Sequence, residues 1–244
     1  RFLLAGWGGD LSFGHAVRIW TIANLGRYVP GKVWSVGALG VMANQAGVSG
    51  VAAAGAALLG TVLNIGAGFG ILAVAGAQTL HVFRPWLQQA AVGVSVLFVL
   101  GTLLLPILLP LVLRRLATWR GGPAITQHLP ARTLWVAVAI NALSWVCYGL
   151  AFAAFVHGLA PQDTGNLSSY VVIWTASYLS GYLVVFAPGG IGVREAVFAA
   201  AIRRDLGSTT AALVALVSRL SFLFADLTCF AAARLNGLRR TSSR

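Results

Sequence analysis

Four apolar stretches, each of about 25 residues and therefore long enough to cross a bilayer as a helix, constrain this chain more than any other feature. Charged residues make up only 9% of the 244-residue sequence, whereas soluble domains carry about 25%. In lipid the protein must satisfy every backbone polar group itself, and no β-barrel alternation is visible. The sequence therefore predicts an all-α polytopic membrane protein, a helical bundle with uninterrupted apolar helices at about 51–77, 89–113, 133–157 and 209–233.

Two further apolar stretches are each broken by proline and glycine. The first covers about 11–46 and is broken at Pro30-Gly31, and the second covers about 168–204 and is broken from Pro188 to Gly192. Proline removes a backbone donor and clashes with the preceding turn, while glycine permits a sharp bend. Each stretch is therefore expected to form two helices that meet at a bend.

The arginines of the loops set the expected orientation. The segment 114–132 and the C-terminal tail carry four arginines each, whereas 158–168 carries none. Arginines gather in cytoplasmic loops, so the C-terminus is predicted to be cytoplasmic and 158–168 extracytoplasmic. The stretch 168–204 must then enter and return as a re-entrant hairpin, although this leaves Arg203 and Arg204 outside. The alternative is a full crossing, which places the four tail arginines outside.

Counting membrane crossings back from the cytoplasmic segment 114–132 makes the stretch 11–46 a hairpin that enters from the cytoplasm. The tripeptide IWT precedes both breaks, at 19–21 and 173–175, and three crossings between the hairpins invert one relative to the other. Inverted repeats with broken helices are typical of secondary transporters, whose site lies near the membrane midplane. The predicted single transmembrane domain, 1–244, thus has repeat 1 at about 11–77 with hairpin 11–46, linking helices at about 89–157, and repeat 2 at about 168–234 with hairpin 168–204.

The two bends predict an anion site inside the membrane. A helix N-terminus has a partial positive charge and free N–H groups, which bind phosphate or carboxylate. Lys32 follows the first break and Arg194 follows the second, so each predicted hairpin tip combines a helix N-terminus with a cation. The alternative is that both breaks are ordinary kinks. The glycines expected to let the backbone approach the anion are Gly31, Gly189, Gly190 and Gly192.

Three ionisable residues, Glu195, Arg219 and Asp226, lie within the last apolar stretches. An ionisable group at the centre of a membrane helix costs about 2.5–3.5 kcal/mol on insertion scales, so these residues are expected to pair. We expect Arg219 to lie within ion-pair distance of Glu195 or Asp226. Two interpretations stay open: a structural pair that fastens the last helix to the hairpin, or a gate or proton-coupling group.

No catalytic, metal or cofactor site is indicated by the sequence. The five acids are scattered, and the four histidines show no ligand spacing. The protein is therefore expected not to be an enzyme and to need no cofactor. Its net charge of +12 fits cytoplasmic loops facing anionic lipid better than nucleic-acid binding. Asn64 and Asn141 are expected to form interhelical hydrogen bonds.

Two segments, GRYVPGKVW at 26–34 and GYLVVFAPGGIGVREAV at 181–197, resemble the signatures of the lysylphosphatidylglycerol synthase transmembrane-region family of flippase-like proteins. The arginine of LVSRLSFLFADL, at 216–227, also resembles a position in the last helix common to that family. The resemblance covers about 15–235 and implies further N-terminal helices. It adds Arg27, from the first signature, to the candidate substrate-binding residues Lys32, Arg194, Glu195 and Arg219 with their neighbouring glycines.

Together, the pattern and the resemblance predict a flippase that moves an anionic or aminoacylated phospholipid between the leaflets of a prokaryotic inner membrane. The phosphate is expected to meet Lys32 and Arg194, and an aminoacyl group to meet Glu195 or Asp226. The alternative is a membrane scaffold or accessory subunit that recruits a lipid synthase or glycosyltransferase without moving lipid. Self-association as a homo-oligomer is compatible with both.

Overall fold

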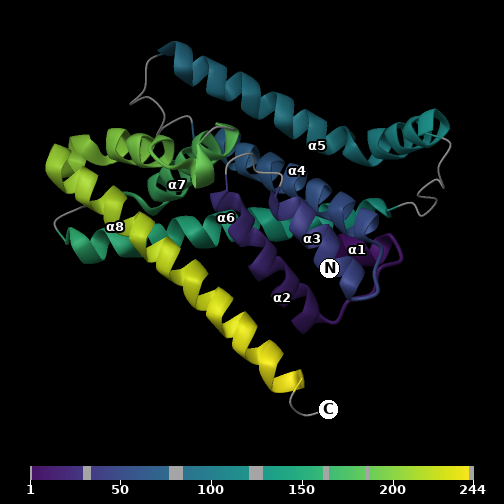
Figure 1. Cartoon of the computed structure of the whole chain (residues 1–244). Helices are drawn as coiled ribbons and strands as arrows, with labels where there is room; N and C mark the ends of the chain where they lie inside the picture. Colours follow the sequence, from purple (N-terminus) through teal and green to yellow (C-terminus); the bar gives the residue numbers. More distant parts are fainter. Residues whose placement is uncertain are drawn as a thin grey trace.

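The structure is a computed structural model that describes residues 2–29, 34–76, 85–120, 129–161, 165–184 and 187–241. Within these ranges the chain forms helices joined by short connections, and no strand is found (Figure 1). The first elements are α1 (Phe2–Gly6), α2 (Phe13–Asn24), the 3₁₀ turn η1 (Leu25–Tyr28), α3 (Trp34–Gln45) and α4 (Gly50–Ala75). These are followed by α5 (Pro85–Arg120), α6 (Ala131–Leu159), α7 (Leu167–Leu183), the 3₁₀ turn η3 (Pro188–Gly190) and α8 (Val193–Thr241).

Among the described residues, three helical segments are long and apolar enough to span a membrane: Gly50–Ala75, Ala131–Leu159 and Asp205–Arg234. They correspond to three of the four uninterrupted stretches expected from the sequence, which confirms an all-helical protein with membrane-spanning helices. The fourth expected stretch lies inside α5, where Val92–Leu105 forms a shorter apolar segment. α5 lies along α4 and exposes many aliphatic side chains on its outer face.

Local chemistry explains where several of these helices begin. Ser49 accepts a hydrogen bond from the backbone N–H of Ala52 at 3.3 Å and caps α4. The side chain of Asn166 accepts a hydrogen bond from the N–H of Ser168 at 3.1 Å and caps α7. Such caps satisfy N–H groups that have no partner within the helix.

The main hydrophobic core surrounds α7. Its buried residues come from α4, α6, α7 and from α8 on both sides of Gly207. α7 has nine buried residues along its 17, so it is enclosed on nearly all sides. The prediction that Asn64 and Asn141 form interhelical hydrogen bonds is confirmed, because the Asn64 amide of α4 donates to the Asn141 side-chain oxygen of α6 at 2.8 Å. The indole N–H of Trp145 also donates to the Asn64 carbonyl at 2.9 Å, which ties α6 to α4 a second time.

The segments on either side of each proline–glycine break lie close to each other. In the first half, a Cβ on Gly26 would lie 2.7 Å from the backbone nitrogen of Ser35, so η1 is pressed against the start of α3. In the second half, a Cβ on Gly190 would lie 2.9 Å from the Cα of Gly181, so η3 is pressed against the end of α7. Each contact is possible because glycine has no side chain.

A second bend divides α8. Gly207 has a φ of 75° and a ψ of 162°, which interrupts the helix. Figure 1 shows the result: the first part of α8 lies beside α7, and the second part runs past α2 to the C-terminus. The predicted stretch 168–204 therefore consists of α7, η3 and the first part of α8.

Candidate functional site

Five charged residues, Arg27, Arg194, Glu195, Arg219 and Asp226, form a group that we call the charged cluster. They come from η1, from the first turn of α8, and from the second part of α8. Arg219 lies near the middle of the candidate span Asp205–Arg234. The cluster therefore belongs to the apolar part of the bundle, where each charge needs a partner.

The first contact in the cluster joins η1 to the second part of α8. Arg27 forms an ion pair with Asp226 in which the guanidinium donates to the carboxylate. The hydroxyl of Tyr28 donates to the same carboxylate oxygen at 2.5 Å. Arg27 and Tyr28 also form a cation–π contact, because the Arg27 guanidinium lies 5.2 Å from the centre of the Tyr28 ring. Asp226 thus holds two neighbouring side chains that lie nearly 200 positions away in the sequence.

The second contact joins η3, the start of α8 and its second part. Arg219 Nη1 donates to the Gly189 carbonyl at 3.0 Å, and Arg219 Nε lies 3.6 Å from Glu195 Oε1. The other Glu195 oxygen accepts a hydrogen bond from the Gly192 N–H at 2.7 Å. A glutamate that bonds back to the N-cap N–H stabilises the first turn of a helix. Of the two acids predicted as partners of Arg219, Glu195 is the one within ion-pair distance. Whether this pair has a structural role or acts as a gate or proton-coupling group stays a prediction.

The two contacts meet at Tyr28. The Arg219 guanidinium lies 5.8 Å from the centre of the Tyr28 ring. A Cβ on Gly189 would lie 2.9 Å from Arg219 Nη2 and 3.2 Å from the same ring, so the glycine lets both side chains lie close to the backbone. Gly189 also has a φ of +58°, a conformation that favours glycine.

Arg194 has a different environment, which we call the aromatic cage. Its guanidinium lies 4.3 Å from the Trp174 ring centre, 5.1 Å from those of Tyr178 and Phe222, and 5.6 Å from that of Phe198. A cation over aromatic faces within about 6 Å is stabilised by roughly 0.5–2 kcal/mol, more when water is excluded. Arg194 is only 7% exposed, and no hydrogen-bond partner is found for its Nη2 within the described residues.

The geometry of α7 explains why Arg194 lies in this cage. Trp174, Tyr178 and Gly181 are four and then three residues apart, so they share one face of the helix. A Cβ on Gly181 would lie 3.3 Å from the Arg194 Cβ, so the missing side chain leaves room for the arginine stem. From the sequence, Arg194 was predicted to bind an anion together with a helix N-terminus; in the structure its guanidinium is buried against rings of α7 and α8.

The predicted site residues therefore fall into three groups. Glu195, Arg219, Gly189 and Gly192 are in mutual contact, and Arg27 is paired with Asp226. Arg194 is near them but lies in the cage. Gly31 and Lys32 lie outside the described residues.

Sequence reasoning missed Tyr28 and the four rings of the cage. Tyr28 follows Arg27 directly in the first signature, so an aromatic residue beside a candidate cation was the available signal. The cage has a weaker signal, because aromatic residues at helical spacing in an apolar stretch usually indicate ordinary core packing.

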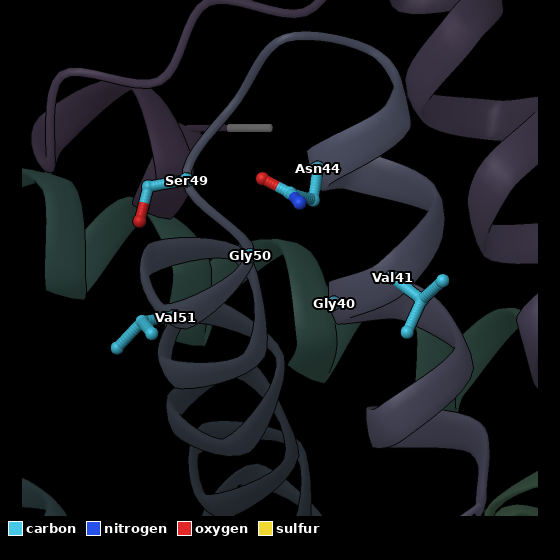
Figure 2. A pocket seen from close by; sticks show the side chains of 6 residues that line it. All are labelled: Gly40, Val41, Asn44, Ser49, Gly50 and Val51. Carbon is cyan, nitrogen blue, oxygen red and sulfur yellow. The ribbon is translucent and has the colours of Figure 1, made fainter.

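A depression at the turn between α3 and α4 lies apart from these residues. It is lined by Gly40, Val41, Asn44, Ser49, Gly50 and Val51, and Figure 2 shows it between the end of α3 and the first turn of α4. It is open to the outside and has no charged side chain. None of its lining residues belongs to the charged cluster or the cage.

The contacts of the charged cluster are ion pairs and hydrogen bonds. Within the part of the chain that the structure describes, no group of histidine, cysteine or acidic residues is arranged to hold a metal ion. The side chains of Arg27 and Arg219 are partly exposed, and each is held in an ion pair. An incoming anion can take the place of the carboxylate in either pair.

Comparison with known proteins gives one clear relationship. The model of one protein family, described as the lysylphosphatidylglycerol synthase TM region, matches residues 1–227. No curated protein and no solved structure matches the chain significantly. The match covers both proline–glycine breaks and every member of the charged cluster. This chain is therefore a member of the lysylphosphatidylglycerol synthase TM-region family, a family of membrane proteins with a connection to lipid.

Proposed function

We propose that this protein moves a phosphate-bearing lipid between membrane leaflets and performs no chemistry on it. The observation that supports the proposal most strongly is the charged cluster, which joins the two proline–glycine segments inside an apolar bundle. Charged residues within membrane segments are costly and mark ion or substrate pathways. The family relationship supports lipid as the substrate.

The transport cycle follows from which contacts can be exchanged. A lipid phosphate is a good bidentate acceptor for arginine, so it competes with Asp226 for Arg27 and with Glu195 for Arg219. The first exchange loosens the connection between η1 and the second part of α8, and the second loosens the connection between the two parts of α8. The headgroup moves past the cluster while its tails remain in the bilayer.

The proposal includes two inverted repeats with re-entrant hairpins in a cell membrane, with the C-terminus cytoplasmic. It is supported by the close approach of the segments that flank each break, Gly26 to Ser35 and Gly190 to Gly181. Cysteines placed at single positions and labelled from each side test this arrangement. Labelling around Gly190 from the cytoplasmic surface, as for a loop, would contradict the re-entrant hairpin.

Transport is tested with the full chain in vesicles that contain a fluorescent analogue of an anionic phospholipid. The parent protein is expected to bring the lipid to both leaflets, and Arg219→Gln and Lys32→Ala to slow this at least tenfold. Arg203→Gln is the matched control, because Arg203 is exposed on the same helix and outside the cluster. Equal rates in all four proteins contradict the site. A parent protein that moves no lipid contradicts transport and favours the scaffold, which is then tested by co-purification with a lipid synthase or glycosyltransferase.

A further inference from the structure

Both acids of the charged cluster are already occupied by cations of the protein. Asp226 accepts from Arg27 and Tyr28. Glu195 pairs with Arg219 through one oxygen and accepts from the Gly192 N–H through the other. An incoming ammonium group would therefore find no unpaired carboxylate in the cluster and would have to compete with an arginine for either one.

The buried groups near Arg194 are, by contrast, hydrogen-bond donors without partners. Among the described residues, Arg194 Nη2, Trp174 Nε1 and Ser177 Oγ are buried and have no hydrogen-bond partner. The guanidinium and indole groups can only donate, and a serine hydroxyl can donate as well. Buried polar groups in proteins are nearly always hydrogen-bonded, so three such donors in one region require an explanation.

The three residues that carry these donors are neighbours where α7 packs against α8. Trp174 and Ser177 are three residues apart on α7, which places them on the same side of that helix. The Arg194 guanidinium lies 4.3 Å from the Trp174 ring centre. Ser177 is fully buried and Trp174 is 2% exposed, so water is largely excluded from both.

The charges of the cluster, like the unpartnered donors, favour a negatively charged ligand. Three arginines face two carboxylates, which leaves one positive charge without an acidic partner. That charge belongs to Arg194, which is within electrostatic range of Arg219 and Arg27 as well as of Glu195. The aromatic cage stabilises the cation but does not neutralise it.

We propose that this site binds an anionic headgroup of the phosphodiester or carboxylate class and rejects an aminoacylated, cationic one, with Arg194 as the residue that makes the distinction. The proposal rests on the proposed lipid-transport function, because it names the substrate class of the same site. The partly accessible Arg27 and Arg219 meet the anion first, and Arg194 receives it deeper in the bundle, where the unpartnered donors lie.

Binding to the full chain in detergent tests the proposal without requiring transport. The probes are phosphatidylglycerol, its lysyl ester, phosphatidylcholine and inorganic phosphate, and the readout is the ligand-dependent shift of the thermal unfolding midpoint. Phosphatidylglycerol is expected to bind at least tenfold more tightly than its lysyl ester or phosphatidylcholine. Inorganic phosphate shows whether the site binds any phosphate or also requires the rest of the lipid. We expect it to compete only weakly with phosphatidylglycerol.

Variants identify the residue responsible. Arg194→Gln is expected to abolish the preference for phosphatidylglycerol, Arg194→Lys to restore part of it, and the exposed control Arg203→Gln to leave it unchanged. If Arg194→Gln does not fold, the preference of the parent protein and of Arg194→Lys still decides the question.

Two results overturn the proposal: tighter binding of the lysyl ester by the parent, or an unchanged preference in folded Arg194→Gln. If phosphatidylglycerol binds as expected but no lipid moves in vesicles, the substrate class holds and transport fails. If lipids of every charge move at one rate, transport holds and the anionic preference fails.

Discussion

The segments around the two proline–glycine breaks share a layout but differ in burial. Each contains the tripeptide IWT, then a glycine that touches backbone across the break. Trp20 of the first IWT is 57% exposed, whereas Trp174 of the second is 2% exposed. Similar hydropathy therefore produces a peripheral segment in one half and the centre of the core in the other.

The difference also decides how each half holds its cation. Arg27, in η1 before the first break, pairs with an acid from α8. Arg194, after the second break, lies among aromatic rings and has no acidic partner within the described residues. An arginine in a dry environment can be stabilised by rings as well as by a carboxylate, so two similar motifs need not bind a ligand in the same way.

The comparison is tested most strongly by the two tryptophans. Trp174→Ala is expected to destabilise the protein by about 3–5 kcal/mol, because it leaves a cavity in the core and removes a ring from the cage. Trp20→Ala is expected to change stability by less than about 0.5 kcal/mol, as for most exposed positions. Thermal unfolding in one detergent measures both. Equal losses would show that the two IWT segments are equally buried, contrary to the structure.

The next effect concerns the backbone of the second break. Gly190 and Gly192 both have positive φ, at 72° and 83°. A Cβ on Gly190 would overlap the Gly181 backbone, whereas a Cβ on Gly192 would meet open space. Alanine at either position incurs strain of about 1–3 kcal/mol, and only Gly190→Ala adds the overlap. Unfolding midpoints should therefore fall further for Gly190→Ala than for Gly192→Ala, and the reverse order would contradict the close packing of η3 on α7.

The contrast between the IWT segments also shows which features of the fold and the site could be predicted from the sequence. Apolar length predicted the spanning helices, and the cost of charge in a membrane predicted that Arg219 pairs with an acid. Neither argument includes the position of neighbouring helices. The aromatic cage depends on where α7 packs against α8, and the pairing of Asp226 with Arg27 depends on where η1 meets the far end of α8. Both are long-range contacts that spacing along one helix does not reveal.

A smaller effect separates the two ion pairs. Asp226→Asn removes the charge that accepts from Arg27 and Tyr28, so we expect a loss of about 1.5–3 kcal/mol. Glu195→Gln keeps an oxygen for the Gly192 N–H and loses only a 3.6 Å ion pair, so we expect less than about 1 kcal/mol. Chemical or thermal unfolding of both variants gives the comparison. A larger loss for Glu195→Gln would make the Arg219 pair the stronger connection between the segments.

The last effect concerns Tyr28, which touches both contacts of the cluster. Tyr28→Phe removes the hydroxyl that donates to Asp226 but keeps the ring beside Arg27 and Arg219, so we expect a loss of about 0.5–1.5 kcal/mol. Tyr28→Leu removes the ring as well and is expected to lose more. If the ring connects the two ion pairs, Arg219→Gln and Asp226→Asn should be non-additive with Tyr28 intact and closer to additive in Tyr28→Leu, because residues that share a partner are coupled. Additivity in both backgrounds would show that the two contacts act independently, and that the first break is joined to the second by Asp226 alone.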